Sequence, residues 1–175
     1  MSALRRALDA LYLGSGVAAS LCLIAILLLI VIQMLARWTG EVFPGAPAYV
    51  AYAMAAASFL AFAHALNRGS HIRVSILLNA VGPKARWVIE VWCFAIATAI
   101  MWYFVYYAVR FVNFSIMIND ISQEQDKTPL WMPQSVMVVG AIILAIAVTD
   151  NLISLFVTGK HRILRDTVDM HSEGE

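Results

Sequence analysis

The stretch ALYLGSGVAASLCLIAILLLIVIQMLA, residues Ala10–Ala36, decides the fold. It contains no charged residue, and Asp9 and Arg37 flank it. An α-helix needs about 20 predominantly apolar residues to cross the roughly 30 Å hydrocarbon core of a bilayer. The apolar region of a cleaved signal peptide is only about 7–15 residues long. We therefore expect a retained transmembrane helix at about residues 11–36.

Three further stretches are long and apolar enough to cross a membrane, at about residues 48–66, 87–118 and 133–156. Glu90 and Arg110 interrupt the composition of the 87–118 stretch. Their 20-residue separation corresponds to about 30 Å of helix, which places the two charges at opposite membrane faces. The sequence therefore predicts an all-α membrane protein. Its four transmembrane helices form one domain over residues 1–159, and residues 160–175 form a tail.

The composition excludes several classes of protein. Apolar residues make up 62% of the 175-residue chain and charged residues 13%, against roughly 45–50% and 25% in soluble domains. A soluble core of this size cannot hide that excess. The net charge of +1 provides no basic field for nucleic acid. Cys22 and Cys93 lie inside apolar runs and form no disulfide framework or metal-finger spacing.

The distribution of lysine and arginine predicts the orientation, because cytoplasmic loops carry an excess of both residues. The positive residues on one side of the predicted helices are Arg5, Arg6, Arg68, Arg73, Lys84, Arg86, Lys160, Arg162 and Arg165. Those on the other side are Arg37 and Lys127, with Arg110 at that face. We therefore expect both termini and the tail in the cytoplasm, and the acidic segment Asp120–Asp126 outside.

Small residues mark one face of the second predicted helix. They are Ala53, Ala57, Ala61 and Ala65. Such a stripe lets two helix backbones approach closely in lipid. We predict that this alanine stripe is a contact face for a neighbouring helix or partner subunit. The alternative is that the stripe arises by chance, because alanine is common in membrane helices. Ala141, Ala145 and Thr149 form a weaker stripe, and Gly14-Ser15-Gly16 is expected to form a packing notch.

The loop at residues 67–86 is expected to lie under the bilayer as an amphipathic segment. His71 to Ile76 alternates with period two, so both helix and strand remain open for it. Arg68 and Arg73 are expected to face lipid phosphates. A sharper hypothesis is that His71 and Arg73 contact a partner subunit.

No catalytic constellation is visible in the sequence. His64, Glu90 and Asp150 all fall near the ends of predicted helices, where charged groups are far less costly than at the membrane midplane. They suit interfacial snorkelling and helix pairing better than a proton relay. We predict no enzyme, cofactor or metal site.

Several motifs occur in a particular order along residues 11–156. Arg37 closes the first predicted helix, and Phe62-Ala63-His64-Ala65-Leu66 ends the second. Gly69-Ser70-His71-Ile72-Arg73-Val74 and then Lys127–Pro133 follow. In this order the chain resembles the small membrane (Q) subunit of tripartite ATP-independent periplasmic (TRAP) transporters, whose motif is Gly-x-His-Ile-Arg-Val. The chain departs from the family at Ser75, where an acidic residue is frequent, and at Glu41, where the family often has adjacent acids.

The resemblance implies a non-catalytic role in sodium-driven organic-acid uptake across a bacterial or archaeal inner membrane. In such systems a large membrane subunit carries the sodium and substrate sites, and a soluble periplasmic protein delivers the substrate. The small subunit scaffolds the large one and helps to dock the binding protein. On this basis Asp120, Glu124 and Asp126 are expected to form a docking rim. Two alternatives stay open: an autonomous four-helix carrier, with Glu90 as its candidate coupling group, and a membrane anchor of a redox complex.

Overall fold

The residues that the structure describes form four long helices. The computed structural model describes residues 3–41, 45–67, 83–123 and 127–158. The helices are α1 (Ala3–Thr39), α2 (Ala46–Asn67), α4 (Pro83–Met117) and α5 (Trp131–Thr158). Each is long and apolar enough to span a membrane. The predicted all-α fold with four transmembrane helices is confirmed.

Every helix begins before the hydrocarbon span expected from the sequence. The 35 residues of α4 correspond to about 52 Å of helix, well over the roughly 30 Å hydrocarbon core. Pro47, Pro83 and Pro133 lie in the first turns of α2, α4 and α5, where a missing backbone N–H costs little.

Residues in the left-handed backbone conformation end α1 and α4. Gly40 has φ 82° and Asn119 has φ 51°. The following amides, of Glu41 and Asp120, donate to the carbonyls of Ala36 and Ser115 at 2.9 and 3.0 Å. This is the Schellman arrangement, which satisfies carbonyls that the last helical turn would leave free.

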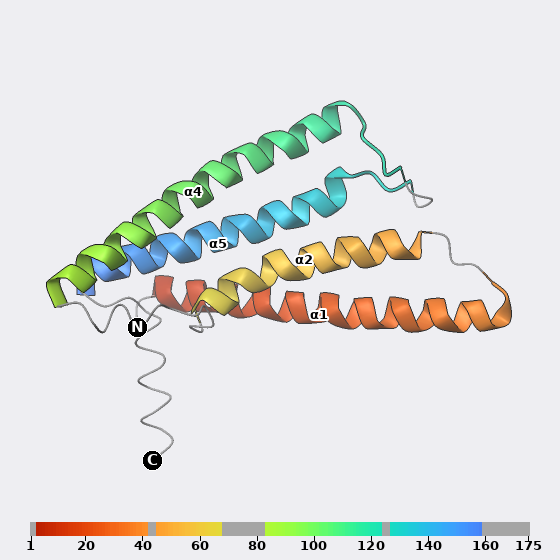
Figure 1. Ribbon diagram of the computed structural model, residues 1–175, viewed down its shortest axis with the longest axis horizontal. Helices are drawn as coiled ribbons and strands as arrows, with labels where there is room; N and C mark the ends of the chain where they lie inside the picture. The colour runs from red at the N-terminus through yellow and green to blue at the C-terminus, as the bar shows by residue number, and fades with distance from the viewer. Residues whose placement is uncertain (1–2, 42–44, 68–82, 124–126, 159–175) are drawn as a thin grey trace, which may run out of the picture.

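Successive helices run in opposite directions (Figure 1). The start of α1, the end of α2, the start of α4 and the end of α5 lie together at what we call the terminal end. The opposite end, where α1 leads to α2 and α4 leads to α5, is the hairpin end. In space the order is α1, α2, α5, α4, because α2 and α5 pack against each other and join the two hairpins.

The core follows this row of helices. One cluster joins α1, α2 and α5, and consists of Tyr12, Ala19, Leu60, Ala63, Ile143 and Ala147. The other joins α4 to α5 through Val105, Ala141 and Ala145. Helix α5 contributes to both clusters and is the central element. A row of helices leaves broad apolar faces exposed, which suits lipid or another membrane protein rather than water.

Candidate functional site

Two glycines allow the helices to approach closely. A Cβ added at Gly16 of α1 would lie 2.8 Å from Cγ of His64 in α2. A Cβ added at Gly140 of α5 would lie 2.7 Å from the backbone carbon of Phe59. The predicted packing notch in α1 is therefore formed by Gly16, because Gly14 has no neighbour within 4 Å of an added Cβ.

The alanine stripe of α2 lies largely within the chain's own packing. Ala57 is buried, and Ala61 packs against the cluster that joins α1, α2 and α5. Ala53 and Ala65 are half-buried. Ala53 also borders an apolar groove of about 300 Å³ between α2 and α5 near the hairpin end.

A second stripe on α2, which was not predicted from the sequence, is buried more completely. It consists of Ala56, Leu60, Ala63 and Asn67. Its spacing of four, three and four residues is the ordinary signature of a buried helix face. In α5 the predicted small residues Ala141 and Ala145 are fully buried beside Val105 of α4. Thr149 Oγ1 accepts a 3.1 Å hydrogen bond from Trp102 Nε1.

Buried polar groups connect three helices at the terminal end. Asn151 of α5 is fully buried, and its Nδ2 donates to Oδ1 of Asn67 in α2 at 3.2 Å and to the carbonyl of Ala147 at 2.8 Å. His64 Nδ1 lies 3.2 Å from the carbonyl oxygen of Tyr12 in α1. A polar pair inside a membrane domain favours one register of the helices, because the alternative leaves the amides unpaired in an apolar medium.

The charged residues of this region also lie toward the terminal end. Glu90 is buried, and Asp150 interacts electrostatically with Arg5 of α1. This arrangement supports helix pairing near the membrane surface. In the described ranges, no three His, Cys, Asp or Glu side chains come together as a metal-binding group.

The hairpin end carries a defined loop between α4 and α5. Ser122 donates its backbone N–H to the Thr128 carbonyl at 2.9 Å, and Leu130 donates to the Asp120 carbonyl at 3.0 Å. These bonds hold the loop closed at its base, where Asp120 is half-exposed. Several predicted features lie outside the described residues. They are Glu124 and Asp126, the loop residues His71 and Arg73 with their amphipathic segment, and the tail at residues 160–175.

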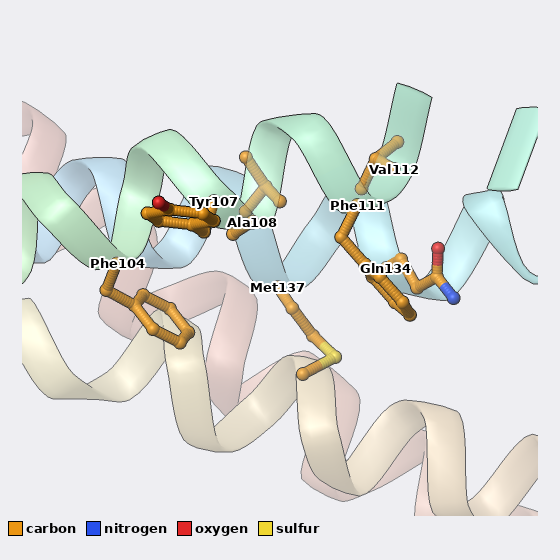
Figure 2. Close-up of a pocket in the computed structure, with 8 residues that line it drawn as sticks. Phe104, Tyr107, Ala108, Phe111, Val112, Gln134 and Met137 are labelled. Carbon is orange, nitrogen blue, oxygen red and sulfur yellow. The ribbon is translucent and has the colours of Figure 1, made fainter. Parts of the chain in front are cut away.

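An apolar groove of about 290 Å³ runs between α4 and α5. Figure 2 shows Phe104, Tyr107 and Phe111 projecting from α4, and Met137 and Gln134 from α5. Its other lining residues are Ala108, Val112 and Val138. This groove was not predicted from the sequence.

Comparison with protein families identifies the chain. The family of the DctQ component of tripartite ATP-independent periplasmic transporters matches residues 26–158, about three quarters of the sequence. The chain belongs to this family. It is a TRAP transporter component and a multi-pass protein of the inner membrane, and its partners are other TRAP components. A comparison with curated proteins gave no match.

Proposed function

We propose that this DctQ-family chain is a non-catalytic small permease subunit. It scaffolds the large TRAP membrane subunit and helps to dock a periplasmic substrate-binding protein during sodium-driven organic-acid uptake. The observation that carries the proposal is the family match over residues 26–158. The architecture supports it, because a row of helices with broad exposed apolar faces offers the surface that a large membrane partner requires.

The polar groups within the helices support a scaffold rather than a carrier. The hydroxyls of Ser20, Ser58 and Thr98 donate to the carbonyls four residues earlier in their own helices. The hydrogen-bond donor of each of these hydroxyls is thus used within its own helix. Carriers commonly build substrate sites from broken helices near the midplane, whereas all four helices here are continuous.

The partner surfaces follow from the same proposal. Ala53 and Ala65 of α2 contact the large subunit, and so do His71 and Arg73, which follow α2 in the sequence. Asp120, Glu124 and Asp126 form the rim that steers the binding protein, since complementary charge raises the rate of encounter between partners. With both termini in the cytoplasm, this rim faces the periplasm.

Uptake into reconstituted vesicles tests the function. Vesicles with a sodium gradient and binding protein should take up substrate only when they contain both the large subunit and this chain. Glu90→Gln should retain substantial uptake, because a scaffold has no titrating group in the transport cycle. Uptake by the chain alone, abolished by Glu90→Gln, would instead establish an autonomous carrier. A Soret band in the purified chain would point to the redox anchor.

Charge reversal tests the rim separately. Replacing Asp120, Glu124 and Asp126 with lysine should raise the half-saturating concentration of binding protein several-fold. The matched control reverses three acids of the tail, Asp169, Glu173 and Glu175, and should leave that concentration unchanged. If the two triple variants changed the half-saturating concentration of binding protein equally, the result would contradict a docking role for the rim.

A further inference from the structure

Arg110 of α4 is a cation without an acidic partner among the described residues. Its side chain is exposed, and its guanidinium carbon lies 5.9 Å from the ring centre of Tyr106. Arg110 lies about 30 Å along the helix from Glu90. This distance places Arg110 at the boundary between hydrocarbon and headgroups on the hairpin side. Arginine at this depth extends toward the interface, where phosphate groups are the abundant anions.

A set of aromatic rings connects Arg110 to the groove between α4 and α5. The rings of Tyr106 and Tyr107 have centres 5.3 Å apart and meet edge to face. Tyr107 itself lines the groove (Figure 2). A ligand that reaches from Arg110 into the groove would therefore pass over the rings of Tyr106 and Tyr107.

The groove has the shape and polarity of a site for a hydrocarbon chain. Its α4 wall runs from Phe104 to Val112, about 12 Å along the helix. The lining is apolar except for the Tyr107 hydroxyl and the amide of Gln134, in the first turn of α5 at the hairpin end. The polar end thus lies toward the headgroups and the apolar end toward the bilayer interior.

We propose that this surface binds one glycerophospholipid from the leaflet at the hairpin end. Arg110 binds its phosphate, one acyl chain occupies the groove from Val112 down to Phe104, and the Gln134 amide lies at the level of the glycerol esters. Charge complementarity between Arg110 and a phosphate favours a lipid headgroup over the apolar face of a partner helix. The site is independent of which membrane face the hairpin end occupies.

Photo-crosslinking tests the site in the full chain, alone and in complex with the large subunit. The probe is phosphatidylglycerol with a diazirine in one acyl chain, at a few molecules per protein in phosphatidylcholine nanodiscs. Labelling should concentrate on Phe104–Val112 and Gln134–Val138 and should saturate. The exposed face of α1 around Leu23 and Leu27 reports bulk lipid and should label weakly.

Variants separate the two parts of the site. Arg110→Gln should reduce saturable labelling about tenfold, which corresponds to about 1.4 kcal/mol, because the variant loses the charge-assisted contact to the phosphate. Arg37→Gln, at an exposed arginine of the same end, should leave it unchanged. Ala108→Leu should narrow the groove and reduce labelling there, with unchanged melting showing that the fold is intact. If that variant melts early, Val138→Phe, which narrows the groove from α5, should reduce the labelling instead.

Competitors distinguish a lipid from its isolated phosphate. Unlabelled phosphatidylglycerol should compete, whereas glycerol phosphate at the same concentration should not. Equal labelling of α1 and the groove, or an Arg110→Gln variant that labels as the wild type does, would overturn the proposal. So would loss of groove labelling on assembly with the large subunit, since the occupant would then be protein.

Discussion

Gly14 and Gly16 stand two residues apart in α1 but have opposite surroundings. A Cβ at Gly16 would collide with the His64 ring, which the Tyr12 carbonyl holds in place. Gly16→Ala should lower the free energy of unfolding by about 1–3 kcal/mol through overpacking. Gly14→Ala should be neutral or stabilising by up to about 1 kcal/mol, because alanine favours the helix. Thermal unfolding in detergent measures both, and equal melting of the two variants would contradict the close contact of α1 and α2.

The Asn67–Asn151 pair predicts a measurable coupling between α2 and α5. A double-mutant cycle with Asn67→Ala and Asn151→Ala should give a coupling free energy of about 0.6 kcal/mol, and at most about 2, as for other polar pairs in membrane proteins. Each single variant leaves one buried amide without its partner. Strictly additive losses on unfolding in detergent would show that the hydrogen bond does not link the two helices.

At the scale of residues, the sequence predicted His64, Glu90 and Asp150 near helix ends, and Glu90 and Asp150 lie about two turns from the terminal ends of α4 and α5. It could not reveal that Asn67 meets Asn151, 84 positions away. Spacing along one helix defines a face, but it does not specify which other helix that face will meet. The groove beside Tyr107 was missed for the same reason, because it exists only where α4 and α5 diverge.

The crossing of α2 and α5 depends on Gly140. Because an added Cβ would meet the backbone of Phe59 rather than a side chain that can move, Gly140→Ala should force the helices apart. We expect a loss of about 1–3 kcal/mol or more, together with weaker co-purification of the large subunit. Gly14→Ala serves as the control for adding a methyl group to a helix. Unchanged melting of Gly140→Ala would show that α2 and α5 are not in close contact at this point.

The elements themselves were predictable to within a few residues at most boundaries. Hydrocarbon thickness sets the apolar length, so the composition located all four spans. The charged residues Arg5, Arg6 and Asp9 limited the expected span, but charges do not end a helix outside the hydrocarbon, so α1 begins at Ala3 rather than near Leu11. The i, i+4 spacing found Ala57 but missed Ala56 and Ala63, because a face packed against two neighbouring helices follows alternating steps of three and four.

The order of the helices in space was not predictable from the sequence. Each helix is apolar on nearly all sides, so periodicity does not distinguish faces toward lipid from faces toward protein. The close approaches at Gly16 and Gly140, with the buried asparagines, are the features that select the row α1, α2, α5, α4. These glycines and asparagines are visible in the sequence, but the residues that they contact are known only once the helices are packed together.

The orientation of the whole molecule makes a direct prediction. In a chain with Cys22 and Cys93 replaced by serine, single cysteines at Glu41 and Gln123 sit at the hairpin end, and those at Arg6 and Ala85 at the terminal end. The excess of lysine and arginine on that side of the chain predicts that the terminal end lies in the cytoplasm. An impermeant thiol reagent should therefore label only the first pair in intact cells, and all four after permeabilisation. Labelling of Arg6→Cys in intact cells would reverse the assignment.

Co-purification with the large subunit tests the central claim most directly. An affinity-tagged version of this chain, expressed with the large TRAP membrane subunit of the same system, should isolate that subunit in a fixed ratio. The complex should melt higher than either part, because binding stabilises the folded state. A chain that purifies alone, with its melting unchanged by the large subunit, would contradict its assignment as a scaffolding component of a TRAP transporter.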